Sequence, residues 1–123
     1  MPLISRQVQL ARRPVGRIQV GDFRIVEAAI PDPAQDEVLV RNLWISVDAA
    51  LRLRLGETTP QGYLSPLPLH EPLISTCIGE IVRSHAAGFA AGDFVTHIQG
   101  YRDYAVVNVA GATLAGAGAL TVV

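Results

Sequence analysis

The chain has 123 residues and a formal net charge of −1, which suits one domain with a core of its own. This charge gives no electrostatic case for nucleic acid or for an anionic membrane, so neither is expected as a partner. The single cysteine, Cys77, excludes an internal disulfide. Arg12 and Arg13 interrupt the N-terminal apolar run, so no signal peptide is expected and the predicted location is cytoplasmic.

Half of the residues are apolar, a high proportion for a domain that stands alone in water. Two explanations compete. The apolar residues could fill an ordinary core, or some of them could form a surface that docks against another domain or another copy of the chain.

The first half of the chain predicts three strands. Residues 7–10, 23–30 and 38–45 are rich in apolar and β-branched residues with partial alternation. Residues 12–16 and 31–33 contain proline with glycine or aspartate, and such residues interrupt strands.

The pattern changes at Ser46. Ser46 and Asp48 are good N-cap residues, residues 49–55 favour a helix, and Gly56 is a plausible stop. Asp48 and Arg52 are four residues apart, close enough on a helix for an ion pair. We therefore predict one short helix here.

Residues 57–72 carry four prolines and predict a long loop, which in a barrel domain would cover one mouth. Tyr63 and His70 belong to this loop.

The second half predicts the rest of the sheet. Residues 77–82 and 104–109 have the composition of strands, and another strand is expected to start at Phe94. Gly79 indicates a close backbone approach or a bulge. Together with the glycine turns around residues 88–93, this is the pattern of a small antiparallel barrel.

Two side chains of this half are expected inside. Tyr104 is predicted to lie in the core, and His97 is predicted to be packed within its strand rather than to carry protons.

Residues 111–123 form an uncharged, Gly/Ala-rich tail. The uncharged stretch from Tyr104 onward is near the ~20 residues of a membrane span. Its three glycines, its polar residues and the lack of a basic flank argue against such a span. Gly116 and Gly118 lack the third glycine and the strand–turn–helix context of a dinucleotide-binding fingerprint.

The order of these segments resembles the N-terminal, GroES-like domain of medium-chain dehydrogenase/reductases. The resemblance covers roughly Gln7 to Val109 and rests on an ordered set of segments rather than on one motif. In chain order these are Arg-Arg-Pro-Val-Gly-Arg (12–17), Asp-Phe-Arg-Ile-Val-Glu (22–27), Glu-Val-Leu-Val-Arg-Asn (37–42), Ser-Val-Asp (46–48), Gly-Glu-Ile-Val (79–82), Gly-Asp-Phe-Val (92–95) and Gly-Tyr-Arg-Asp-Tyr-Ala-Val-Val (100–107). The order matches the zinc-independent branch, which holds NADP-dependent alkenal and prostaglandin reductases and their bacterial relatives.

The resemblance implies a mostly-β, partly open GroES-like barrel with one short helix over residues 1–110. Residues 111–123 would then lead to a nucleotide-binding domain, because these 123 residues encode no βαβ unit with a Gly-rich turn. The implied function is that of the substrate-side domain of an NADP-dependent, zinc-free oxidoreductase that reduces enone- or quinone-type double bonds. The chain alone is expected to be inactive and not to bind NADP tightly.

The resemblance also bears on metal binding, because many dehydrogenases with this domain use a catalytic zinc held by about three protein ligands. His70 and Glu71 resemble the His-Glu pair of those enzymes. Ser46, however, stands about where their first cysteine ligand would be, and no cysteine cluster could hold a structural zinc. No metal is therefore expected.

In the family, the turn at Ser46 faces the nicotinamide and the substrate, so the resemblance implies a cleft at the start of the predicted helix. No catalytic residue is identified. Relatives usually carry Pro-Tyr after the aspartate, whereas this chain has Ala49 and Ala50, which removes an aromatic wall and a phenolic hydroxyl. Tyr101 stands where relatives mostly have tryptophan. The candidates for the substrate cleft are Ser46, Asp48, Arg52, Tyr63, His70 and Tyr101.

The alternative to an enzyme domain is a non-catalytic GroES-like binding module. Its apolar face would recruit a protein partner or pair with a second copy as a homodimer. A nucleotide-binding domain encoded downstream of Val123 would favour the enzyme, and unrelated sequence there would favour the module.

Overall fold

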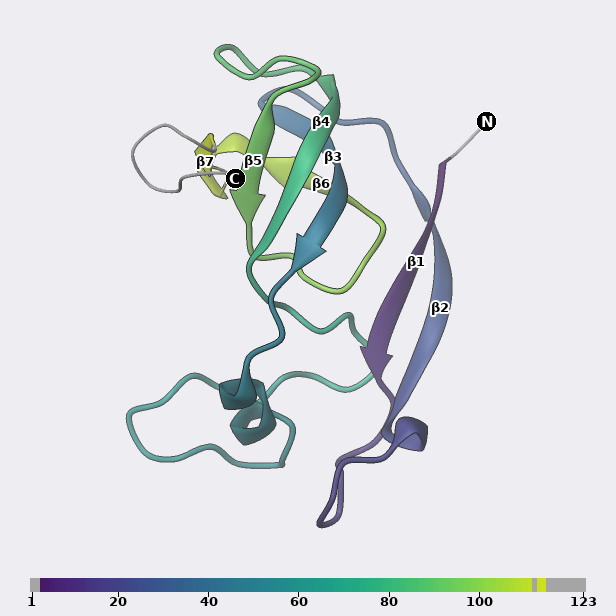
Figure 1. Ribbon diagram of the computed structural model, residues 1–123, viewed down its shortest axis with the longest axis vertical. Coiled ribbons are helices and arrows are strands. Elements are labelled where there is room, and N and C mark those ends of the chain that lie inside the picture. Colours follow the sequence, from purple (N-terminus) through teal and green to yellow (C-terminus); the bar gives the residue numbers. More distant parts are fainter. Residues whose placement is uncertain (1–2, 112, 115–123) are drawn as a thin grey trace.

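The computed structural model describes residues 3–111 and 113–114, which form two antiparallel β-sheets (Figure 1). Strands β1 (Leu3–Leu10) and β2 (Phe23–Ile30) make a two-stranded sheet. The other sheet has five strands in the order β6-β3-β4-β5-β7. Its strands are β3 (Glu37–Ile45), β4 (Cys77–Ser84), β5 (Phe94–His97), β6 (Tyr104–Asn108) and β7 (Thr113–Leu114). The predicted mostly-β fold is confirmed, and the described strands form two sheets rather than one closed barrel.

Within the described part of the chain, three 3₁₀ helices connect the strands: η1 (Val20–Asp22), η2 (Ala49–Arg54) and η3 (Val109–Gly111). The predicted short helix is η2, but its geometry is 3₁₀ throughout. Its bonds include Leu51 N–H to the Asp48 carbonyl at 3.0 Å, a three-residue span. Asp48 is the N-cap residue, yet its side chain makes no capping hydrogen bond.

The core of the five-stranded sheet follows the two-residue period of its strands. Its buried members are Val38, Val40, Ile81, Val95, Ala105 and Val107. On β6 this alternation turns Ala105 and Val107 inward and leaves Tyr104 half-buried. The prediction that Tyr104 lies in the core is therefore wrong, because Ala105 and Val107 face the core, and Tyr104 and Val106 alternate with them.

A second cluster joins segments that are distant in the sequence. Leu10 at the end of β1 packs with Leu55, Leu67 and Leu73, all of which are buried. Leu67 belongs to the predicted proline-rich loop, and its N–H donates to the Arg54 carbonyl at 2.8 Å. The long loop thus folds back and contributes to the core, because it carries an apolar side chain and partners for its backbone.

At two of the described glycines, Gly79 and Gly100, backbone approaches backbone too closely for a side chain. At Gly79, a Cβ atom would lie 2.5 Å from the Arg41 carbonyl oxygen, and the register with β3 shifts between Asn42 and Trp44. The predicted close approach and a bulge are both present. At Gly100, φ is +67°, and a Cβ atom would lie 2.7 Å from Ile74 Cα.

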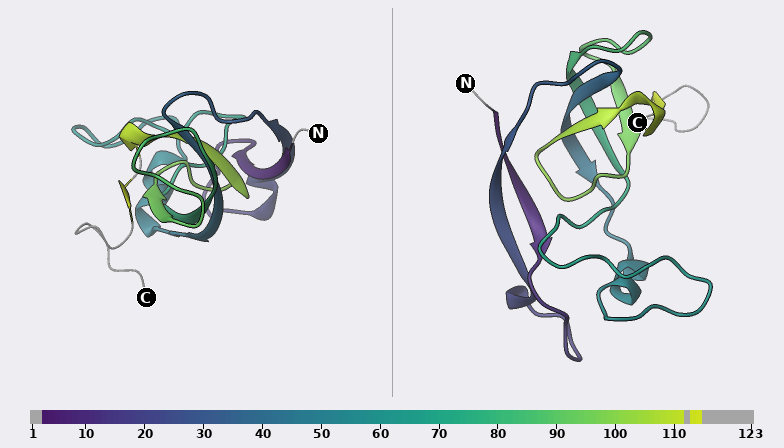
Figure 2. Two further views of the ribbon diagram at one scale, coloured as in Figure 1. Left: turned by 90° about the horizontal axis from the view of Figure 1, so that it is seen from above. Right: turned by 180° about the vertical axis from the view of Figure 1, so that it is seen from behind.

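The β1–β2 hairpin lies beside the five-stranded sheet (Figures 1 and 2). Backbone hydrogen bonds join β1 to two loops next to that sheet. Val8 N–H donates to the Tyr101 carbonyl at 2.9 Å, and Leu73 N–H donates to the Val8 carbonyl at 2.9 Å. The edge of β1 away from β2 is therefore covered by two loops, and these same loops lead to the site described below.

No helix among residues 3–111 and 113–114 is long and apolar enough to cross a membrane. The prediction for the tail, residues 111–123, falls largely outside the described residues. Within it, Thr113 and Leu114 pair with β5 as strand β7.

We expect Gly100→Ala to destabilise the chain far more than Gly16→Ala. Both glycines have positive φ, but a Cβ atom at Gly16 would meet nothing within 4 Å. Gly16→Ala should lower the free energy of unfolding by about 1 kcal/mol through φ alone. Gly100→Ala should cost about 3 kcal/mol or more, because overpacking adds to the same strain. Urea unfolding of the two variants measures this, and equal losses would contradict it.

Candidate functional site

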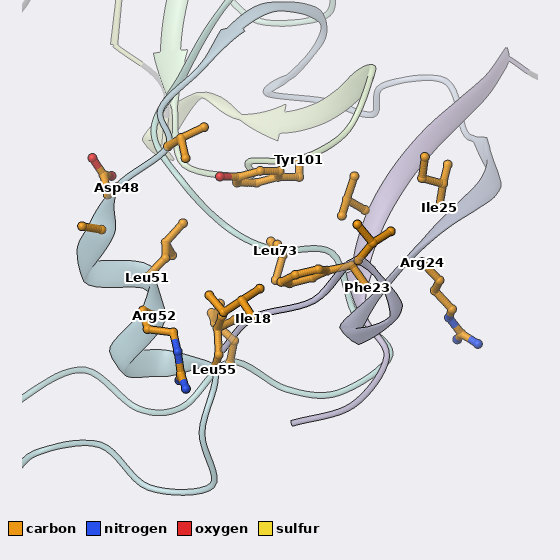
Figure 3. A pocket seen from close by; sticks show the side chains of 15 residues that line it. Ile18, Phe23, Arg24, Ile25, Asp48, Leu51, Arg52, Leu55, Leu73 and Tyr101 are labelled. Atoms are coloured by element: carbon orange, nitrogen blue, oxygen red, sulfur yellow. The ribbon is translucent and has the colours of Figure 1, made fainter. Parts of the chain in front are cut away.

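A cavity of about 920 Å³ opens between the β1–β2 hairpin and η2, with Tyr101 above it (Figure 3). The hairpin side supplies Phe23 and Ile25, and the η2 side supplies Leu51 and Leu55. Most of the lining is apolar. Among the described side chains that line the cavity, polar groups come only from Arg24, Asp48, Arg52 and Tyr101. Such a cavity suits an apolar small molecule with few polar atoms.

Three of the six predicted cleft residues meet at this cavity: Asp48, Arg52 and Tyr101. Ser46 lies next to it, and its carbonyl oxygen accepts a hydrogen bond from the Tyr101 hydroxyl at 3.4 Å.

Tyr63 and His70 lie elsewhere. Tyr63 lines a neighbouring pocket of about 250 Å³, which shares Asp48 and Leu51 with the larger cavity. His70 lines neither of these two spaces; its side chain is exposed, and its N–H donates to the Leu10 carbonyl at 2.7 Å. The loop that carries both residues is therefore split between a pocket wall and a β1 edge contact.

The predicted ion pair between Asp48 and Arg52 is wrong. The Ser46 hydroxyl donates to Asp48 Oδ1 at 2.9 Å, while Arg52 Nη2 donates to the Gly16 carbonyl at 2.9 Å. A 3₁₀ helix turns every three residues, so side chains four apart do not lie one above the other as they do on an α-helix. Arg52 instead ties η2 to the turn that precedes β2.

Tyr101 is held by its backbone on both sides. Its N–H donates to the Leu73 carbonyl at 3.0 Å, and its carbonyl accepts from Val8 N–H at 2.9 Å. Burial raises the pKa of Tyr101, and the negative charge of Asp48 raises it further. The phenol is therefore a neutral hydrogen-bond donor at neutral pH.

A buried polar network lies behind Tyr101. His97 Nδ1 accepts from Gln99 N–H at 3.1 Å, so its Nε2 carries the proton and donates to Asn42 Oδ1 at 2.7 Å. Asn42 Nδ2 donates in turn to the Arg102 carbonyl at 3.0 Å. The network joins β3 and β5 to the loop that carries Tyr101. The prediction that His97 is packed is confirmed.

The surroundings of His97, the central residue of this network, keep its imidazole uncharged. Burial, and then the positive charge of Arg102, lower the pKa of His97 to about 4. Cys77 Sγ lies 3.3 Å from the same imidazole, and burial raises the pKa of this thiol. Neither group is therefore poised to exchange protons near neutral pH.

The apolar residues that line the cavity were not among the candidates from the sequence, and they include Ile18, Val20, Phe23 and Ile25. Ile25 is 70 % exposed and Val20 is 92 % exposed, so they line the cavity on a solvent-facing wall. The available signal was the presence of apolar residues just after the Gly16 turn, where polar residues are usual.

Acidification should destabilise the chain through His97. The unfolded histidine has a pKa near 6.5 and the folded one about 4, so the unfolded chain binds the proton more readily. Stability from this group is present above pH 6.5 and is lost as the pH falls through about 4, by about 3 kcal/mol. Unfolding measured against pH should show a steeper acid loss in the wild type and in His85→Gln than in His97→Gln. His85, whose side chain is exposed, is the matched control. An NMR titration of His97 with a midpoint near 6.5 would contradict this.

The absence of a bound metal stays a prediction. Among the described residues, no group of three or more His, Cys, Asp or Glu side chains is placed to hold a metal ion. We expect elemental analysis of the chain, purified without chelators, to find no stoichiometric zinc. One tightly held zinc per chain would contradict this.

Comparisons with known proteins identify the family. Residues 6–114 match the family model described as the N-terminal domain of oxidoreductase, and the chain belongs to this family. The chain is 35% identical over 108 residues to a Bacillus subtilis protein named as the NADP-dependent oxidoreductase YfmJ, covering 88% of this chain and 31% of that protein. It is 27% identical over 100 residues to the NADPH-dependent curcumin reductase of Escherichia coli, covering 81% of this chain and 28% of that protein. The resemblance to a GroES-like oxidoreductase domain is thereby confirmed.

Solved structures show the same fold. The crystal structure of CurA from Vibrio vulnificus superposes with a TM-score of 0.83 at 29% identity, covering 91% of this chain and 32% of that one. The structure of CurA in complex with NADPH gives a TM-score of 0.80 at 31% identity, covering 89% and 32%. The chain thus spans about a third of the length of the relatives that it matches.

Proposed function

We propose that the chain is the substrate-side domain of an NADP-dependent, zinc-free oxidoreductase that reduces enone- or quinone-type double bonds. The observation that carries this proposal is the apolar cavity of about 920 Å³ at the start of η2, where the resemblance implied a substrate cleft. The names of the relatives, an NADP-dependent oxidoreductase and a curcumin reductase, support the cofactor and the kind of substrate.

The chemistry would be divided between this chain and a nucleotide-binding domain. NADPH would supply the hydride. The residues present do not suit its phosphates, because the cavity lining is mostly apolar and the sequence has no Gly-rich βαβ turn. They suit the reacting end of an apolar substrate, which they would bind, orient and shield from water.

The exposed apolar surface of the chain supports the proposal that another domain docks on it. Val20, Val47 and Trp44 are 92 %, 83 % and 74 % exposed. In the proposed enzyme a nucleotide-binding domain would cover part of this surface. Pairing with a second copy as a homodimer stays a prediction.

We expect the 123-residue chain alone to oxidise no NADPH in the presence of an enone, since it lacks a Gly-rich βαβ unit. A protein in which this chain is joined to a nucleotide-binding domain should oxidise NADPH when given an enone, and the loss of nicotinamide absorbance measures this. The hydrocarbon analogue of the same enone is the matched control and should give no oxidation. If such a two-domain protein binds neither NADPH nor the enone, the enzyme proposal is overturned and the binding module is favoured.

A further inference from the structure

The hydroxyl of Tyr101 differs from every other polar group of the cavity. The remaining polar side chains among the described lining are charged and already engaged. Arg52 Nη2 donates to the Gly16 carbonyl, and Asp48 accepts from the Ser46 hydroxyl. Arg24 Nη2 donates to Gln9 Oε1 at 3.1 Å. Tyr101 therefore offers the one neutral hydroxyl of the described lining.

The hydrogen bond that Tyr101 makes is weak and replaceable. Its hydroxyl lies 3.4 Å from the Ser46 carbonyl oxygen, beyond the usual range for an O–H donor. That carbonyl already accepts a shorter bond, 2.7 Å, from the Ser75 hydroxyl. If the Tyr101 proton turned to another acceptor, Ser46 would keep a partner, so little energy would be lost.

The ring, in contrast, is fixed in place. The backbone of Tyr101 is bonded to β1 and to Leu73, and Gly100 packs against Ile74 without room for a Cβ atom. Figure 3 shows the ring above the cavity with its hydroxyl directed towards Asp48, at the start of η2. A donor whose position is held by rigid backbone costs little entropy when it binds a ligand.

From this geometry we propose that the Tyr101 hydroxyl binds the carbonyl oxygen of the ligand, exchanging its bond to Ser46 for one to the ligand. The ligand class is an apolar compound that carries a single conjugated carbonyl group. A neutral donor suits a carbonyl oxygen, and it also suits the enolate oxygen that forms when a hydride is added to an enone, because negative charge strengthens the hydrogen bond. This inference rests on the proposed function.

The test compares two probes that differ in one oxygen atom. Benzylideneacetone carries the conjugated carbonyl, and its hydrocarbon analogue carries a methylene in that place. Calorimetry with the full chain should show about a tenfold preference for the ketone, the gain from one hydrogen bond at the upper end of the usual range. In Tyr101→Phe the preference should fall to about twofold or less, while affinity for the hydrocarbon is kept.

Tyr104→Phe is the matched control, because it removes a hydroxyl from a half-buried tyrosine outside this cavity. It should keep the full preference for the ketone. The infrared carbonyl stretch of bound benzylideneacetone gives a second readout, which a purely structural role of Tyr101 would not move. It should be lowered in the wild type and in Tyr104→Phe, and return towards its free value in Tyr101→Phe.

The outcomes separate this inference from the function on which it rests. Equal preference for the ketone in the wild type and in Tyr101→Phe would overturn the role of Tyr101 and leave the cavity as an enone site. An unshifted carbonyl stretch in the wild type would overturn it even if the variant failed to fold. Failure of both probes to bind the wild type would overturn the inference together with the substrate-side function.

Discussion

The contact between Gly100 and the backbone of residues 73–75 is the constraint on which the site depends. Gly100 has φ +67°, and a Cβ atom there would lie 2.7 Å from Ser75 N. This approach lets Tyr101 N–H reach the Leu73 carbonyl and lets the Tyr101 carbonyl reach β1. Three chain segments therefore meet at one point, and the aromatic ring of Tyr101 has a fixed position over the cavity.

The polar network behind this point secures the same loop from its other side. His97, Asn42 and the backbone of residues 99–102 satisfy one another without a net charge at the imidazole. No buried side-chain nitrogen or oxygen among the described residues lacks a hydrogen-bond partner. A satisfied network of this kind rigidifies a loop, whereas an unpaired group would cost stability. The apolar cavity thus lies next to a polar network in which the buried groups have hydrogen-bond partners.

The candidate site shows where reasoning from sequence works and where it stops. The spacing of β-branched residues predicted β2, β3, β4, β5 and β6, and Ser46 with Asp48 correctly marked the start of η2. The predicted ion pair between Asp48 and Arg52 is absent because η2 is a 3₁₀ helix. The sequence could not show this, since over six residues helix-forming side chains do not distinguish a 3₁₀ helix from an α-helix. Tyr63 and Tyr101 both come from loops, yet only Tyr101 faces the large cavity.

The sequence by itself determined the strands, the turns between them and the family, because these depend on local periodicity, on glycine and proline and on the order of segments. The tertiary structure alone decided which side chains share the cavity. Its walls come from the β1–β2 hairpin, η2 and the loop after β5, which are brought together by backbone contacts between residues far apart in the chain. Such contacts leave no periodic signal, since each depends on where a loop folds and not on which residues are its neighbours in sequence.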